Sequence, residues 1–201
     1  MSTQTAPPVD PPRRPAAPAR KRRPSRPPLW AGLIGVAVIV AVAVAAFLLL
    51  RGDDGVKLTL GKPRVVSASQ LSSYARDNNR TIDWAGAAAS GFKLELTEIT
   101  GHRVYVRYLS SGAQAGDPRP AFTAIGTYPM QDALTKLRAA SSRPGAVAGT
   151  LSGGGVTLYY KKRPTNVYVA RPGSNVLVEV FAPQAGAALQ LARSSTLSQV
   201  R

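Results

Sequence analysis

The residues in this chain that could best do chemistry are cations set beside tyrosines. Guanidinium and ammonium groups next to aromatic rings attract anionic polymers, lipid surfaces and acidic proteins. Since the 201-residue chain has a formal net charge of +16, the sequence predicts an anion-binding patch, with a merely solvated basic face as the alternative interpretation. The patch residues are Arg103, Tyr105, Arg107, Tyr160, Lys161, Lys162 and Arg163.

Candidate catalytic groups are few. His102 is the only histidine, so a multi-histidine metal site is excluded. Ser152 misses the nucleophile-elbow spacing by one position, and Gly153–Gly155 lacks the Lys-Ser/Thr pair of a phosphate loop. The absence of cysteine excludes disulfides, thiolate metal sites and a catalytic thiol. We expect a protein that is not an enzyme and has no catalytic residue, cofactor or metal site, and an envelope hydrolase ranks last among the alternatives.

One apolar run dominates the N-terminal part of the chain. It extends from Leu29 to Leu50, 22 residues without a charge or proline, which is long enough to cross a hydrocarbon core as a helix. A cleaved signal peptide is the competing interpretation, but its apolar region is usually about 7–15 residues long. The sequence therefore predicts a transmembrane helix. Ala37, Ala41 and Ala45 recur every four residues, a spacing that would also allow a homo-oligomer.

The residues before this run predict its orientation. Residues 1–28 are rich in proline and arginine and poor in large apolar side chains, so we expect a disordered tail. Basic residues are retained in the cytoplasm, which places the tail inside and the C-terminal domain outside a bacterial plasma membrane. The juxtamembrane cations would also contact anionic lipid of the inner leaflet, a contact that a phosphate on Ser25 would weaken. They are Arg20, Lys21, Arg22, Arg23 and Arg26.

Beyond the membrane helix the sequence predicts a stalk over residues 51–62 and an extracytoplasmic α+β domain over residues 63–201. Strand-like alternation and helical spacing follow the order three strands, a helix, three strands and a helix. We expect an antiparallel sheet with helices on one face, and the order also fits two βββα units. The predicted strands are 92–98, 103–109, 122–128, 156–160, 166–170 and 175–181, and the predicted helices begin at Ser67, Pro129 and Pro183.

The hairpin of the first two strands is the most specific local prediction. Alternation over Phe92–Glu98 and Arg103–Leu109 places the apolar side chains of each strand on one face. Pairing these two sets requires an odd loop, and Ile99-Thr100-Gly101 fits, with Gly101 in the left-handed conformation. The glycine-rich residues 145–155 are predicted to be a flexible connection. Val176–Phe181, apolar on both faces apart from its single glutamate, is predicted to lie centrally in the sheet.

Three short motifs carry a resemblance to a known group. They are YVRYL at Tyr105–Leu109, GTYP at Gly126–Pro129 and PTNVYV at Pro164–Val169. With these motifs, residues 81–181 resemble uncharacterised single-pass envelope proteins of high-GC actinobacteria. The resemblance implies a membrane-anchored protein with an extracytoplasmic domain, and its motifs are structural and imply no activity. An excess of Arg over Lys, 19 to 7, fits a GC-rich genome.

Charge and topology together favour a binding role. From Arg51 onward there are 19 Lys and Arg against 9 Asp and Glu, a net charge of +10. The sequence predicts a non-catalytic envelope domain that binds an anionic wall polymer, a lipid surface or a membrane protein partner. A structural or assembly subunit of a membrane complex is the alternative. Nucleic acid would leave the same charge footprint and ranks behind these partners.

Overall fold

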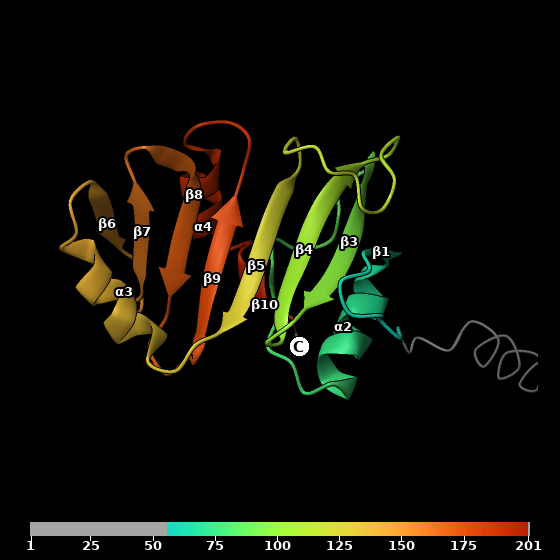
Figure 1. Cartoon of the computed structure of the whole chain (residues 1–201), viewed down its shortest axis with the longest axis horizontal. Coiled ribbons are helices and arrows are strands. Elements are labelled where there is room, and N and C mark those ends of the chain that lie inside the picture. The colour runs from blue at the N-terminus through green and yellow to red at the C-terminus, as the bar shows by residue number, and fades with distance from the viewer. Residues whose placement is uncertain (1–55, 201) are drawn as a thin grey trace, which may run out of the picture. The chain divides into compact units, whose positions relative to one another are not determined.

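The computed structural model describes residues 56–200, so the predicted tail and the predicted transmembrane helix lie outside the described residues. One antiparallel sheet of eight strands, in the order β1-β3-β4-β5-β9-β8-β7-β6, forms its centre (Figure 1). Helices pack on this sheet, which confirms the α+β class and the antiparallel sheet. Among residues 56–200, no helix has the length and apolarity needed to cross a membrane.

The elements follow one another closely along the chain. The strands of the large sheet are β1 (Arg64–Val66), β3 (Phe92–Ile99), β4 (Arg103–Ser110), β5 (Thr123–Pro129), β6 (Ala146–Thr150), β7 (Val156–Tyr160), β8 (Arg163–Ala170) and β9 (Val176–Phe181). A separate ladder pairs β2 (Asp83–Trp84) with β10 (Ser198–Gln199). The helices of the described residues are α2 (Ala68–Asp77), α3 (Ala133–Ser141) and α4 (Ala187–Arg193).

The predicted β3–β4 hairpin, its shared apolar face and its odd loop are confirmed, but the loop is residues 100–102, one residue later than predicted. Leu96 pairs with Val106, and both are fully buried. The loop between the paired residues Ile99 and Arg103 contains three residues, and Gly101 has a φ of 76°. An odd loop of this kind keeps the apolar residues of both strands on one face.

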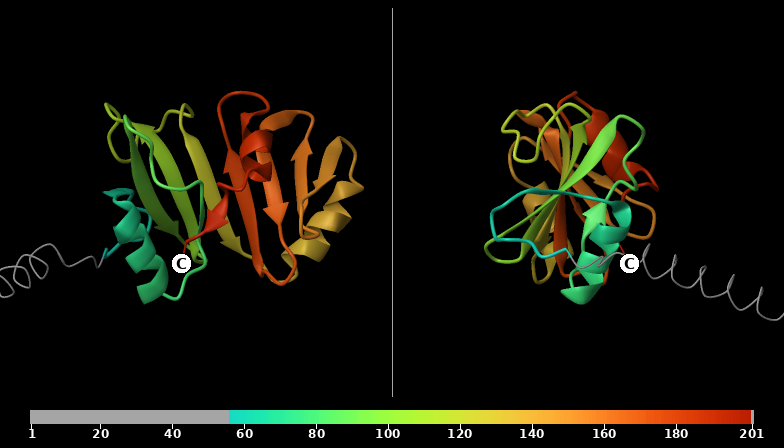
Figure 2. Two further views of the ribbon diagram at one scale, coloured as in Figure 1. Left: turned by 180° about the vertical axis from the view of Figure 1, so that it is seen from behind. Right: turned by 90° about the vertical axis from the view of Figure 1, so that its right-hand side faces the viewer.

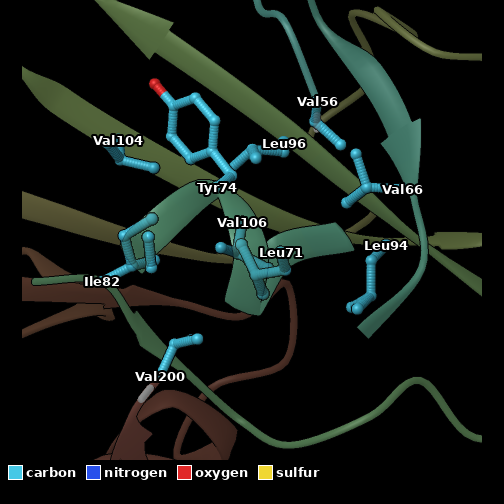
Figure 3. Packing of buried hydrophobic residues seen from close by; sticks show 11 residues of the cluster. Val56, Val66, Leu71, Tyr74, Ile82, Leu94, Leu96, Val104, Val106 and Val200 are labelled. Atoms are coloured by element: carbon cyan, nitrogen blue, oxygen red, sulfur yellow. The ribbon is translucent and has the colours of Figure 1, made fainter. Parts of the chain in front are cut away.

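Helix α2 covers the apolar face of this hairpin. Ser67 begins the helix with a capping box that it shares with Gln70, which satisfies backbone N–H groups that a helix start leaves unpaired. Figure 3 shows Leu71 and Tyr74 of the helix among the buried side chains of β3 and β4. Val56, from the segment predicted as a stalk, is buried in the same cluster, so the folded domain includes residues before 63.

Helix α4 lies on the same face as α2. Val106 pairs with Ile125, and Ile125 pairs with Val180, so these three side chains point to one side of the sheet. Ala188 and Ala192 of α4 pack in a cluster with Ile125 and Val180. The left view of Figure 2 looks onto this side of the sheet, with α4 in front of the strands.

Helix α3 lies on the opposite face. Its buried residues Ala133 and Leu137 pack with Leu158 and Ala170, whereas Val169, the neighbour of Ala170 on β8, packs with α4. The prediction of helices on one face is therefore wrong, because β7, β8 and β9 carry apolar residues on both faces. The segments β3-β4-β5-α3 and β7-β8-β9-α4 are consequently not two copies of one βββα unit.

Other boundaries also differ from the sequence predictions. Pro129 ends strand β5 by pairing with Val176, and α3 begins after Asp132 instead. Helix α4 begins at Ala187, four residues after Pro183. Residues 145–155 contain the edge strand β6, because alternating small residues can pair with β7 even though glycine usually weakens a strand. Strand β9 lies centrally, between β5 and β8, as predicted.

A buried ion pair ties the C-terminal segment to the large sheet. The carboxylate of Asp83 is fully buried, and its Oδ1 lies 2.6 Å from Nη1 of Arg171 at the end of β8. Arg171 also donates to the carbonyl oxygen of Leu197, 3.3 Å away, and Asp83 N donates to Oγ1 of Thr127. Burial raises the pKa of Asp83, and the Arg171 charge only partly offsets this effect.

Replacing Arg171 should therefore be costly and dependent on pH. Arg171→Leu leaves an uncompensated buried carboxylate and should lower the free energy of unfolding at pH 7 by about 3–5 kcal/mol. The loss should shrink as the pH falls toward 3.8, the ordinary pKa of this group, because the folded state then takes up the proton that removes the charge. Thermal unfolding of the full chain across this pH range measures the effect. Arg103→Leu, at an exposed site, is the control, and an equal loss at every pH would contradict the assignment.

Candidate binding surface

We call the side of the sheet that carries α3 the α3 face, and Figure 1 looks onto it. Helix α3 contacts β6, β7, β8 and β9, and the loop of residues 111–122 folds over β3 and β4. The centre of the face, formed by β5 and β9, lies between these two covers. On the other side of the sheet the same strands are buried beneath α4. The α3 face is therefore the side on which the sheet can meet a ligand.

The loop of residues 111–122 is held to the sheet by an internal ion pair. Arg107 Nη1 donates to Oε1 of Glu95 at 2.8 Å, and Nη2 donates to the carbonyl oxygen of Asp117 at 2.7 Å. Glu95 is 1% exposed, and the Arg107 guanidinium also lies 5.3 Å from the ring centroid of Phe122. Arg107 is thus engaged within the fold, so we leave it out of the binding surface.

A carboxylate stands among tyrosines in the uncovered centre. Glu179 accepts hydrogen bonds from the Tyr128 hydroxyl and, at 2.7 Å, from Nδ2 of Asn166. The ring of Tyr105 packs edge-on against Tyr128 with centroids 5.7 Å apart. Burial, followed by the hydrogen bond to Glu179, raises the pKa of the Tyr128 hydroxyl, which keeps it a neutral donor. The cluster presents aromatic rings on a rigid floor of paired strands.

A glycine makes room for this arrangement. Gly126 pairs with Glu179 across β5 and β9, and the Tyr128 ring lies over it. A Cβ atom at position 126 would be 2.8 Å from the Tyr128 hydroxyl oxygen and 3.0 Å from its Cζ. Any larger residue at this position would therefore displace the tyrosine from the carboxylate.

An apolar groove lies beside the cluster, between α3 and the floor of the sheet. Its volume is about 480 Å³, which is within the range of ligand pockets. The groove has no acidic residue in its lining. The apolar and aromatic lining residues are Met130, Leu137, Ala139, Ala140, Leu158, Tyr160, Tyr168 and Leu177.

Five cations stand along the groove and at one end of it. Lys136 and Arg143 line it, and Tyr160 leads directly into the β7–β8 turn. The Lys161 backbone N–H donates to the carbonyl oxygen of Gly145 at 2.9 Å, which brings this turn beside Arg143. None of the five forms an ion pair with another residue in the 56–200 part of the chain. We call them the groove cations: Lys136, Arg143, Lys161, Lys162 and Arg163.

The sequence-predicted patch therefore divides into two groups. Arg103, Tyr105 and Arg107 lie on β4, whereas Tyr160 and residues 161–163 lie at the β7–β8 turn, with β5 and β9 between the two groups. The sequence analysis missed Lys136, Ala139, Ala140 and Arg143. Their i, i+3, i+4, i+7 spacing, which places residues on one helix face, was the signal that could have found them.

The remaining candidate groups do not assemble into a reactive site. Ser152 lies in the β6–β7 turn and His102 in the β3–β4 turn, with β5, β9 and β8 between these hairpins. Within the described residues no cluster of three His, Asp or Glu side chains could hold a metal ion. A larger cavity of about 750 Å³ is lined by Arg80, His102 and Arg171, but both arginines are already paired with carboxylates.

Comparison with known proteins identifies no relative of this chain. No family model matches the sequence, and neither a curated protein nor a solved structure matches it.

The position of Tyr128 over Gly126 can be tested by coupled substitutions. Gly126→Ala should lower the free energy of unfolding by about 1–3 kcal/mol, because the added methyl overpacks against the ring. In a Tyr128→Leu background the same change should cost much less, and denaturant unfolding of the four proteins measures the coupling. Gly112→Ala, where a Cβ would meet nothing within 4 Å, is the control. Equal costs in both backgrounds would show that the ring does not lie there.

Proposed function

We propose that the chain is a single-pass, membrane-anchored protein of the bacterial envelope whose folded domain lies outside the membrane. This domain binds an anionic envelope component and does not catalyse a reaction. The predicted helix at Leu29–Leu50 and the basic tail before it support the anchor and its orientation. The resemblance to actinobacterial envelope proteins supports the same location.

The observation that carries the binding role is the set of groove cations beside the uncovered centre of the α3 face. Five cations with no carboxylate partner among residues 56–200 create a local positive potential that an anionic partner can neutralise. Arg107 and Arg171, by contrast, already have internal carboxylate partners. The groove cations are distinguished by lying together beside one apolar groove.

This proposal predicts that charge reversal at the β7–β8 turn weakens binding to an anionic polymer. The parent protein for this experiment is the full chain with its five juxtamembrane cations, residues 20–23 and 26, replaced by Gln, so that only the folded domain contributes to binding. This protein, held in zwitterionic nanodiscs, is applied to immobilised polyglycerol phosphate. Lys161→Glu with Lys162→Glu and Arg163→Glu should weaken binding about 100-fold, since each basic residue near an anionic surface contributes about 1 kcal/mol.

A matched variant separates this site from overall charge. Lys57→Glu with Lys62→Glu and Arg64→Glu reverses the same number of positive charges at exposed positions near the start of the domain. It should bind nearly as well as the parent at 150 mM salt, where charges about 8 Å apart or more are screened from each other. Equal weakening by both triple variants, or no binding by the parent, would refute the proposed role.

The membrane topology can be tested because the chain has no cysteine. Thr3→Cys and Ser152→Cys each introduce a single thiol, the first in the tail and the second in an exposed turn. A membrane-impermeant maleimide should label Ser152→Cys in intact cells and Thr3→Cys only after lysis. The reverse pattern would contradict the orientation, and release of the Ser152→Cys protein into the soluble fraction would show that the apolar segment is cleaved.

A further inference from the structure

The groove between α3 and the sheet suggests what kind of anionic component the domain binds. We propose that it holds one acyl chain of an anionic membrane lipid, with the lipid head group at Arg143, Lys161 and Lys162. This inference rests on the proposed function and narrows it to a ligand class. The occupant is inferred from three features of the groove: its floor on the strands of the sheet, its wall on α3, and its charge.

The floor of the groove is apolar along a continuous line. Leu158 pairs with Tyr168 on the next strand, and Tyr160 precedes the cationic turn at one end. Leu177 lies further along the floor, and Met130 joins it from the end of β5, where its backbone N–H donates to Asn175. An apolar line that starts at cations and runs away from them fits a molecule with a charged head and a long apolar chain.

The wall of the groove is formed by the smallest apolar side chains on α3. Ala139 and Ala140 line the groove between Lys136 on the helix and Arg143 just after its end, while Ala133 and Leu137 anchor the helix to the sheet. Because alanine fills little space, the helix stays attached while a volume of about 480 Å³ remains beside it. Apolar surface left open in this way favours removal of a hydrocarbon chain from water.

The strands that form the floor have no free backbone hydrogen-bonding edge at which a peptide could pair. Strands β7, β8 and β9 are each hydrogen-bonded on both sides, so an extended segment cannot add to them as a further strand. A hydrophilic wall polymer could contact the cations but would leave the apolar floor unused. The charge of the groove excludes a cationic amphiphile, since Lys136 and Arg143 line it without an opposing carboxylate.

The test is photo-crosslinking of the full chain in phosphatidylcholine nanodiscs. The probe is lysophosphatidylglycerol with a diazirine in its acyl chain, added below its micelle concentration. After irradiation and digestion, mass spectrometry locates the label. We expect label on the peptides that contain Leu158, Tyr160 and Leu177, and about tenfold less with a matched lysophosphatidylcholine probe, which has no net charge to meet the cations.

Substitutions on α3 distinguish the groove from general lipid contact. Ala139→Trp fills the groove from an exposed position and should reduce the label about tenfold, whereas Thr135→Trp, also exposed and on the same helix, should leave it unchanged. Both variants are checked by circular dichroism for an unchanged fold. Equal labelling by the two probes, label insensitive to Ala139→Trp, or label elsewhere in the domain would each overturn the inference.

The same variants separate this inference from the proposed function. Ala139→Trp should leave binding to immobilised polyglycerol phosphate intact, because it changes no charge. If the parent binds that polymer through residues 161–163 but takes no label in the groove, the proposed function stands and the lipid assignment falls. If the parent neither binds the polymer nor takes label in the groove, the proposed function and the lipid assignment are both refuted.

Discussion

The antiparallel pairing of β5 with β9 is the interaction on which the rest of the domain depends. It extends from Ala124–Phe181 to Pro129–Val176 and joins two segments, about fifty residues apart in the sequence, into a single sheet. Side chains alternate along each strand, so this register places Ile125 and Val180 on one continuous apolar face for α2 and α4. It places Gly126 and Glu179 on the other face, where the glycine lets a tyrosine ring reach the carboxylate.

The division of helices between the two faces decides where a ligand can bind. Two helices bury one face, while the α3 face is covered only at its sides, by α3 and by the loop that Arg107 and Glu95 hold in place. Buried ion pairs add little net stability, but they specify which segments meet. Arg107 and Arg171 serve this purpose, and the groove cations remain available. Arginine therefore has a structural role at positions 107 and 171 and a proposed binding role at positions 143 and 163.

Much of the fold could be predicted because local patterns determined it. Ser67 marked the start of α2, and alternation across Arg103–Leu109 determined which residues of the hairpin share a face. The observed register places Glu95 opposite Arg107, whereas the predicted loop at residues 99–101 would have placed it opposite Tyr105. The face chosen by α3 could not be predicted, because β7–β9 are apolar on both faces and the choice depends on long-range packing. The groove was missed for the same reason, since it exists only where α3 docks.

The central claim is that the α3 face binds an anionic lipid while the α2 and α4 face supports the fold. Hydrogen–deuterium exchange of the full chain in phosphatidylcholine nanodiscs, with and without lysophosphatidylglycerol, tests it most directly. We expect slower exchange in residues 136–145 and in the β7–β8 hairpin, with no change in residues 68–77 or 187–193. Protection of α2 and α4 instead, or protection equal to that given by lysophosphatidylcholine, would contradict it.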